Sequence, residues 1–462
     1  MDTRLAQIID NFTKKVMGKF SQEDVLKIED LEIKLWEDCS FFVRDSIAAY
    51  TEMIDQLLTA QKEERKEAGI TVHKRNVSRE YLSKFGQVEF NRTYFKTEEG
   101  YSYLADKAVG LESYDRVSTN VSAELVDRAA SMSYQKSAEE TTIGRVTKQT
   151  VLNKIRKTKG LELVPKGIKK KIRVLHVVAD EDHVAMQSGK NVIVPLVTVH
   201  EGIESVSKCR NRCINARHFS EYGKPVSEFW EEIGAWVEEE YDTRSINRIY
   251  LHGDGAKWIR RGMEVLPGCR FVLDRYHLEK WVKAVTAGSM KEYSFRIRKA
   301  LKNYDLKGFV SAIDDMLTEA ESRKQAEMII GLRKYILNNW DGIEIRKNEP
   351  ECGSSCTEAQ ISHVLADRLS RGPKGWSDEG LKYMSRLRVY KVNGEKVTVK
   401  NIMKKDEALE PSEMEKRVVK MVKEAFAGFK DYSIFEKQEL ISGKVTPIST
   451  ILKGIEQVGY VF

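Results

Sequence analysis

Long apolar runs are missing from this sequence, and so is the pattern of a secretory leader. No stretch approaches the roughly 20 consecutive apolar residues that cross a bilayer, which argues against a membrane-spanning protein. The first residues, Met1-Asp2-Thr3-Arg4-Leu5, lack the basic-then-apolar form of a signal peptide. We therefore expect a cytoplasmic protein.

Cysteine is scarce, with six residues in 462. Four of them form two Cys-x3-Cys pairs, Cys209 with Cys213 and Cys352 with Cys356. Zinc knuckles usually place two residues between paired ligands, and these two pairs lie far apart in the sequence. We interpret the cysteines as reduced thiols and expect no zinc site.

The sequence also lacks internal repeats and low-complexity segments. Its 41% hydrophobic and 32% charged residues are typical of a folded protein. A chain of 462 residues exceeds one comfortable hydrophobic core, so two to four domains are expected. The net charge of +7 permits a polyanionic partner without requiring one.

The N-terminal part has a helical period followed by an alternating one. Apolar residues recur at three- and four-residue steps from 22 to about 67, which predicts a long helix. Residues 87–95 mostly alternate between apolar and polar, and Glu98-Glu99-Gly100 then turns the chain into 101–103. This pattern predicts a β-hairpin.

Residues 121–158 predict three short helices: 122–130, 134–141, and a third that Thr147 can cap and that continues to Lys157. The break at Thr142-Ile143-Gly144 gives the outline of a helix-turn-helix, although many all-α proteins share it. The third helix would present residues that contact phosphates or base edges: Lys148, Gln149, Asn153, Lys154 and Arg156.

The next part alternates strands with helices. Strands are predicted at 172–187, 192–199, 246–251 and 269–273, and helices at 225–241 and 256–265. This order indicates a mixed α/β sheet. Residues 276–340 lose the strand pattern and predict a helical insertion.

Three acidic residues stand at informative places in these elements. Asp180 and Asp254 each close an apolar run, and Glu358 opens an amphipathic helix after Gly353-Ser354-Ser355. Carboxylates gathered at strand ends and on a later helix can hold paired divalent cations for phosphoryl transfer. Taken singly, each residue is more often a turn former or a helix cap. Asp182, on the same strand face as Asp180, is an alternative first ligand.

Four segments in the right order carry a resemblance to a known family. They are Ala179–Val184, His252–Ile259, Phe271–Leu278 with an Asp-x-x-His motif, and Cys352–Ser370 followed by 373–377. They resemble DDE transposases of bacterial insertion sequences, a group formerly filed as an uncharacterised protein family and related to Mutator-like transposases. The match covers most of the chain.

The resemblance implies a fold and an activity. The fold is α/β, with a ribonuclease-H-like core, a helical insertion, and an N-terminal region with a β-hairpin and a helix-turn-helix. Asp180, Asp254 and Glu358 would hold Mg²⁺ or Mn²⁺, two ions in all, with Asp274 and His277 bracing them. The activity would be cutting the ends of an insertion sequence and joining them to target DNA.

The same resemblance implies partners and a place of action. The partners would be double-stranded DNA, as terminal inverted repeats and target, and further copies of the chain assembled on it, in a nucleoid-associated, non-membrane location. Arg368 and Lys374 could bind backbone phosphates or lie on a solvated helix face. Trp258 and Trp340 could stack on an unpaired base or belong to the core.

We expect six regions along the chain: 1–118 with the hairpin, 119–165 with the helix-turn-helix, 166–281 as the first part of the core, 282–349 as the helical insertion, 350–395 as the second part of the core, and 396–462 as a C-terminal region. Two other functions remain open. One is a nuclease of the same fold that does not join strands. The other is a catalytically inactive DNA-binding regulator.

Overall fold

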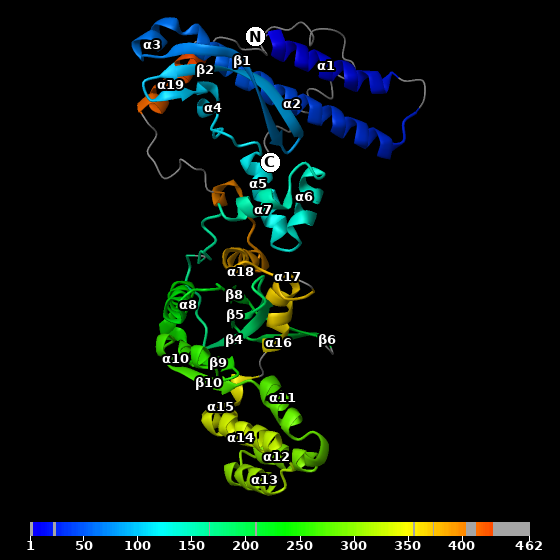
Figure 1. Ribbon diagram of the computed structural model, residues 1–462, viewed down its shortest axis with the longest axis vertical. Helices are drawn as coiled ribbons and strands as arrows, with labels where there is room; N and C mark the ends of the chain where they lie inside the picture. Colours follow the sequence, from blue (N-terminus) through cyan, green and yellow to red (C-terminus); the bar gives the residue numbers. More distant parts are fainter. Residues whose placement is uncertain are drawn as a thin grey trace. The chain divides into compact units, whose positions relative to one another are not determined.

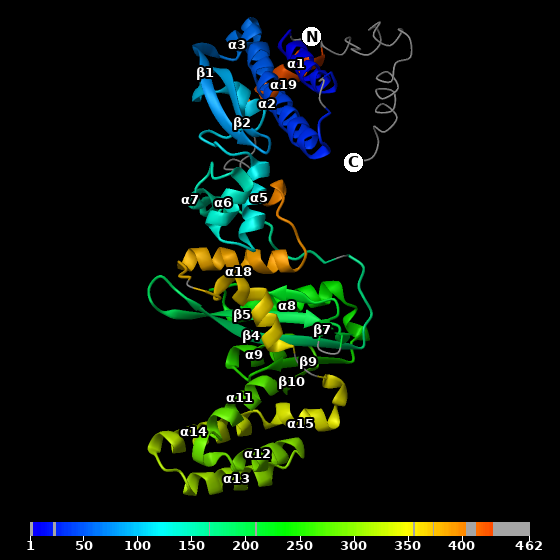
Figure 2. The same cartoon turned by 90° about the vertical axis from the view of Figure 1, so that its right-hand side faces the viewer.

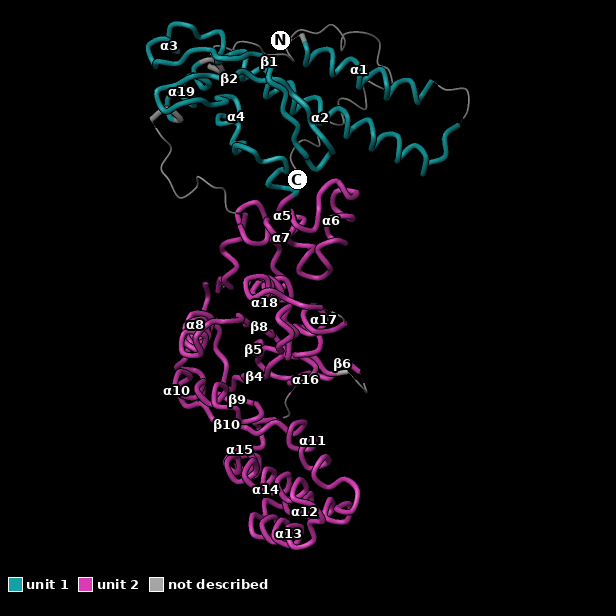
Figure 3. The backbone as a smooth tube through the Cα atoms, viewed as in Figure 1, with its two compact units in different colours: residues 1–121, 404–462 teal, residues 122–403 magenta. Residues whose placement is uncertain are grey.

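The computed structural model describes residues 3–21, 25–165, 167–207, 210–353, 356–372, 374–402 and 413–427. The chain divides into two compact units, one of residues 1–121 with 404–462 and one of residues 122–403 (Figure 3). No helix in these described ranges combines the length and the apolar character needed to cross a membrane.

The first unit packs helices against a three-stranded sheet. Its helices are α1 (Thr3–Phe20), α2 (Ile28–Ala60), α3 (Lys62–Glu67), α4 (Leu104–Ala108) and α19 (Glu413–Ala427), and its antiparallel strands are β1 (Thr71–Ser83), β2 (Gly86–Thr97) and β3 (Gly100–Ser102). The expected hairpin is confirmed as β2 and β3, whereas β1 was missed. Its core joins α2, β2, α4 and α19 through Leu58, Phe95, Leu104 and Met421.

The second unit is built on a mixed five-stranded sheet of order β10-β9-β4-β5-β8. The strand β5 (Asn191–His200) pairs antiparallel with β4 (Val174–Ala185) on one side and with β8 (Arg217–Phe219) on the other. The strands β9 (Arg248–Gly253) and β10 (Cys269–Leu273) extend the sheet in parallel on the other side of β4. A separate hairpin follows β5 and consists of β6 (Ile203–Ser207) and β7 (Arg210–Cys213).

Alternation along the strands gives this sheet one apolar and one polar face. Val177, Ala179 and Leu251 are buried in the main core together with Trp230 of helix α8 (Val226–Glu240). The alternate residues of β4 include His176 and Asp180, which therefore project to the other face. Figure 1 shows α8 on one side of the sheet and α16 (Thr357–Gln360) on the other.

Two short helices, α9 (Lys257–Arg260) and α10 (Gly262–Val265), connect β9 to β10. After β10 the chain is helical in α11 (Arg275–Val285), α12 (Tyr293–Lys302), α13 (Leu306–Thr318), α14 (Arg323–Asn338) and α15 (Trp340–Asn348), visible below the sheet in Figure 2. The chain returns to the sheet with α16, the π-helix η4 (Ile361–Ala366), α17 (Asp367–Leu369) and α18 (Asp378–Val392).

The three-helix segment is also present, as α5 (Thr119–Ala129), α6 (Tyr134–Thr142) and α7 (Lys148–Ile155). Helix α6 ends at Ile143, whose φ of 52° is left-handed, and Gly144 follows with a φ of 74°. The Thr147 hydroxyl accepts a hydrogen bond from the Thr150 amide, so the expected N-cap is confirmed.

Helix α15 packs closely on β10, and this packing predicts opposite effects of alanine at two helical glycines. A Cβ on Gly342 would lie 2.6 Å from the Phe271 ring and 2.8 Å from the Leu273 amide nitrogen. A Cβ on Gly331 of α14 would meet only the Trp281 ring, at 3.6 Å. Gly342→Ala should therefore lower the free energy of unfolding by about 1–3 kcal/mol. Gly331→Ala should raise it by up to about 1 kcal/mol through helix propensity. Urea unfolding of both variants measures this, and equal stabilisation would contradict the packing argument.

Candidate active site

Three aspartates meet on adjacent strands, two at the carboxyl ends of β9 and β10 and one in the middle of β4. Asp180 lies in β4, Asp254 directly follows β9, and Asp274 directly follows β10. In the strand register Val178 is opposite His252, and Val272 is also opposite His252. Two residues further along each strand, the three aspartates therefore share one level and the polar face of the sheet.

The carboxyl group of Asp180 has a perturbed pKa. Burial is the main cause that raises this pKa to about 6; the negative charges of Asp254 and Asp274 act in the same direction, and His277 acts in the opposite one. A buried carboxylate near two others is unfavourable unless a cation neutralises it. The electrostatics thus favour a cation at this edge of the sheet.

His277 lies between two of the aspartates. Its Nδ1 is 2.8 Å from Oδ2 of Asp274, and its Nε2 is 3.9 Å from Oδ1 of Asp180. The hydrogen bond to Asp274 raises the pKa of His277, against the lowering effect of burial. Asp274 also accepts the His277 backbone N–H as the N-cap of α11. Asp274 therefore fixes a histidine that is readily protonated beside Asp180.

Asp182 has different neighbours from Asp180. Its Oδ1 accepts a hydrogen bond from the Ser370 hydroxyl at 2.8 Å, after the end of α17. Burial raises its pKa, and Ser370 opposes that effect. Asp180 is the residue grouped with Asp254, Asp274 and His277, so geometry separates two candidates that strand periodicity could not.

Glu358 is brought to the same face by its backbone. Helix α16 and the following π-helix both pack against β4. The side chain of Glu358 lies outside the described residues, so the expected third ligand is located only by its helix. The π-turn is supported by Arg388, which donates to the carbonyls of His363 and Val364 at 2.9 and 2.7 Å. Such turns are frequent at functional sites.

The carboxylate oxygens of the three aspartates lie along one edge of the sheet and do not enclose a metal site on all sides. Among described side chains, only His200, Cys213 and Cys356 form a group of three metal-binding residues within 4.8 Å, and the aspartates do not. Mg²⁺ keeps several waters and takes only one or two protein carboxylates at many sites. An all-oxygen, anionic, open edge fits that ion.

The helices after β10 brace the loop that carries Asp254. Its Oδ1 accepts the Ala256 amide at 2.9 Å. Gly255 has a φ of 90°, and a Cβ there would lie 2.2 Å from Oδ1 of Asn339. Arg260 donates to the same oxygen at 2.9 Å. A side chain at Gly255 would therefore disturb both the loop and its contact with the start of α15.

Two residues that the sequence suggested for phosphate binding both donate to backbone carbonyls. Arg368 is buried, donates through Nε to the Ala129 carbonyl at 2.9 Å and lies over the Trp376 ring. Burial lowers its pKa to about 10. Lys374 donates to the carbonyls of Asp367 and Arg368. The interpretation of Arg368 as a DNA contact is wrong, because its charge faces the interior; Lys374 holds the turn after α17.

Helix α7 exposes only part of the surface expected from sequence. Lys148, Gln149 and Asn153 are exposed, and Gln149 donates to Asn153 at 3.0 Å. Lys154 is buried, which corrects the expectation that it reaches a groove. Arg156 is paired with Glu379 at 2.6 Å.

The two tryptophans belong to the core rather than to a stacking platform. Trp258 and Trp340 both pack against the main hydrophobic cluster. The Trp258 indole N–H donates to Glu181 at 2.7 Å. The core interpretation is therefore the one that the packing favours.

Sequence reasoning missed a second cluster on the polar face. Cys213 and Cys356, one from each Cys-x3-Cys pair, have their sulfurs 2.8 Å apart beside His200. The hydrogen bond from Cys213 lowers the pKa of Cys356 well below its usual range, and His200 acts in the same direction, although burial opposes them. Cys352 is buried elsewhere, with Tyr250 and Val272. Cys209 lies outside the described residues. The Cys-x3-Cys spacing drew attention to the cysteines, but no sequence pattern indicated His200.

Tyr335 and Arg346 were also missed, because both come from the insertion. The hydroxyl of Tyr335 is buried, and burial together with the charges of Asp254 and Asp274 raises its pKa. Arg346 donates to the Leu273 carbonyl at 3.2 Å, one residue before Asp274.

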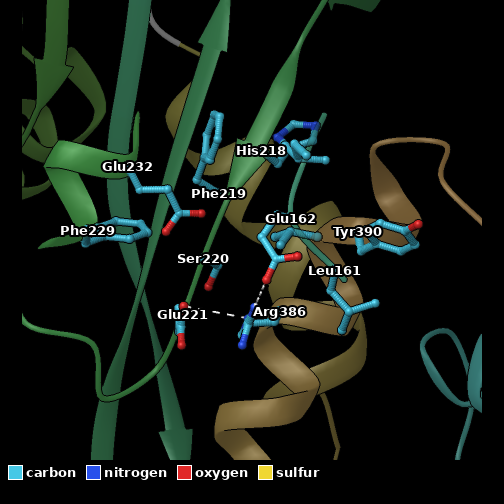
Figure 4. Close-up of a pocket in the computed structure, with 12 residues that line it drawn as sticks. Leu161, Glu162, His218, Phe219, Ser220, Glu221, Phe229, Glu232, Arg386 and Tyr390 are labelled. Atoms are coloured by element: carbon cyan, nitrogen blue, oxygen red, sulfur yellow. Dashed lines mark hydrogen bonds and ion pairs between the residues drawn. The ribbon is translucent and has the colours of Figure 1, made fainter. Parts of the chain in front are cut away.

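A small pocket of the second unit lies away from this chemistry. It has a volume of about 30 Å³ and lies between β8, α8 and α18 (Figure 4). Arg386 crosses it, paired with Glu162 at 2.9 Å and with Glu221 at 3.7 Å. That volume holds about one water molecule, so the pocket is no substrate site.

Similar proteins share nearly the whole chain. A UPF0236 protein of Caldanaerobacter subterraneus subsp. tengcongensis, whose name joins eleven locus designations, is 36% identical over 458 residues, covering 96% of each chain. Another from that organism, with four locus designations, is 35% identical over 456 residues and covers 96% of each. A UPF0236 protein in the vanSb 3′ region of Streptococcus gallolyticus is 25% identical over 332 residues, covering 69% of this chain and 73% of its own.

The family model "Uncharacterised protein family (UPF0236)" matches residues 21–408, which include Asp180, Asp254, the Asp-x-x-His pair and α16. Given this match and the full-length similarity, the chain belongs to the UPF0236 family.

Proposed function

We propose that the protein is a DNA transposase of an insertion sequence, with a ribonuclease-H-like core. The observation that carries the proposal is the group of Asp180, Asp254, Asp274 and His277 at one strand edge, with the helix of Glu358 on the same face. Such convergence suits cation-dependent phosphoryl transfer.

The sheet supports the fold proposed for this core. Three antiparallel strands in sequence are followed by two strands added in parallel beside the first one. This arrangement is the one expected of a ribonuclease-H-like core. It puts Asp180 in the middle of β4 beside the ends of β9 and β10, where carboxylates can share cations.

The multiplicity of the relatives supports a mobile element. One relative's name joins eleven locus designations in a single genome, and another joins four. A protein that moves its own gene would leave such copies, whereas a regulator or a housekeeping nuclease needs one.

The proposed roles of the residues follow from their positions. When bound, two Mg²⁺ or Mn²⁺ ions would supply an activated water and stabilise the leaving oxygen. Asp180, Asp254 and Glu358 would hold them. His277, kept in orientation by Asp274, would present a protonated Nε2 to a phosphate oxygen near Asp180. The 3′-hydroxyl freed by cutting would then attack target DNA by the same displacement.

Two alternatives make different predictions. A ribonuclease-H-like nuclease would cut without joining, and an inactive DNA-binding regulator would bind through α7 without cutting. The buried charge at Asp180 favours an enzyme, because a regulator has no need for carboxylates at this edge.

The first test is the metal ligand Asp254. Asp254→Asn should lower the rate of Mg²⁺-dependent nicking of a duplex carrying the element's ends by more than about 100-fold. Loss of a metal ligand should cost more activity than loss of a residue that only contacts a ligand. DNA binding should persist. Asp314→Asn, an exposed residue paired with Arg333 on the insertion, is the matched control and should cut normally. Full cleavage by Asp254→Asn would remove Asp254 from the site.

A second test separates Asp180 from Asp182. Asp180→Ala should eliminate cleavage and strand joining. Asp182→Ala should only reduce them, to the level of Ser370→Ala, because both changes remove the same hydrogen bond. Cleavage rates at saturating Mg²⁺ decide between them. If Asp182→Ala were inactive and Asp180→Ala active, the first ligand would move by two residues.

A third test concerns the exposed face of α7. Replacing Gln149 and Asn153 together by Ala should weaken binding to the element's ends by about 1–3 kcal/mol per lost base contact. Binding to scrambled duplex should change little, since phosphate contacts dominate there. Lys148→Ala is the matched control and should weaken both. Competition at fixed salt measures the difference; equal losses on both DNAs for the double variant would place end recognition elsewhere.

A further inference from the structure

The cluster of His200, Cys213 and Cys356 joins three separate elements. His200 ends β5, Cys213 ends β7, and Cys356 immediately precedes α16. One ligand atom from each lies within 4.8 Å of the other two. That spacing is the size of one ion's coordination shell.

His200 has the hydrogen bonding of a metal-ligating histidine. Its side chain is buried, with 1% of the residue exposed. Nδ1 is 2.9 Å from the Gly202 carbonyl, to which it can donate, and 3.2 Å from the Gly202 amide nitrogen, and the shorter contact favours the tautomer with the proton on Nδ1. Nε2 then has a free lone pair, and it is buried without a hydrogen-bond partner in the described part of the chain. A backbone carbonyl that fixes one ring nitrogen is the usual support for a ligand at the other.

The two sulfurs also have the surroundings of thiolate ligands. Gln360 points its amide toward both, 3.4 Å from Cys213 and 3.7 Å from Cys356. Two thiolates and an imidazole are soft and borderline donors, which select Zn²⁺ over Mg²⁺. The chemistry is thus distinct from that of the aspartate edge.

We propose that His200, Cys213 and Cys356 bind one Zn²⁺ ion that fastens the start of α16 to β5 and β7. Binding releases to solvent the thiol proton that the cysteine pair still carries. Zn–S bonds of about 2.3 Å in a tetrahedron hold sulfurs about 3.8 Å apart, so the sulfurs separate from 2.8 Å as the ion enters. The proposal does not depend on the proposed function, although the anchored helix carries Glu358.

The experiment measures zinc in the purified full-length protein by elemental analysis, and follows Co²⁺ substitution by its absorption spectrum. We expect one zinc per chain and a tetrahedral thiolate–cobalt spectrum. His200→Ala, Cys213→Ser and Cys356→Ser should each weaken zinc binding by more than about 100-fold. Cys352→Ser is the matched control, since Cys352 belongs to the same pair in sequence but is buried apart from the cluster, and it should retain the zinc.

Thiol titration separates zinc from a Cys213–Cys356 disulfide. In denatured protein without reductant, the zinc site predicts six titratable thiols, whereas a disulfide leaves four, six minus two. Absence of zinc from wild-type protein, a non-tetrahedral cobalt spectrum, or four titratable thiols would overturn the proposal. These readouts use no DNA, so failure to cut or join DNA would leave them unchanged.

Discussion

The buried carboxylate of Asp180 on the central strand is the constraint on which the second unit depends. One face of β4 is apolar and covered by α8, so the alternate residues of the strand have to project from the other face. Two of its neighbours at that edge, Asp254 and Asp274, add negative charge and raise the pKa of Asp180. The edge is consequently suited to a cation, and His277 contributes the positive charge that the chain itself supplies.

Helices from outside the sheet hold this edge in place. Gly342 lets α15 lie directly on β10, and Asn339 accepts from Arg260 beside the loop of Asp254. Arg368 and Arg388 donate to the carbonyls of Ala129 and Ala130 at the end of α5. Arg388 also donates to a carbonyl of the π-turn after α16. The three-helix segment and the Glu358 helix therefore share buried arginines. A displacement of α5 would take the Ala129 carbonyl away from the buried Arg368 guanidinium, at a cost of several kcal/mol for a buried charge.

Much of the architecture could be predicted from local patterns. Strand β10 was expected with its observed bounds, and α8, α7 and the Thr147 cap were expected within about two residues. Strands β1, β6, β7 and β8 were missed because they are short or polar, and their pairing depends on partners elsewhere in the chain. The predictions that Arg368 and Lys154 contact DNA were wrong for a related reason. The sequence shows that a residue is basic, but not which carbonyls or rings surround it in the fold.

The sequence by itself determined the apolar runs, the helix cap, the aspartates that follow two of those runs and the Asp-x-x-His spacing, because each is a property of neighbours along the chain. It did not determine that Asp180 lies inside β4 rather than at its end. Only the tertiary structure decided that Asp180 rather than Asp182 joins Asp254 and His277, since both lie on the same strand face and differ only in what packs there. It likewise decided that Cys213 meets Cys356 and His200. Cys213 and Cys356 are 143 positions apart in the sequence, and His200 belongs to another strand. Only strand pairing and helix packing bring such residues together.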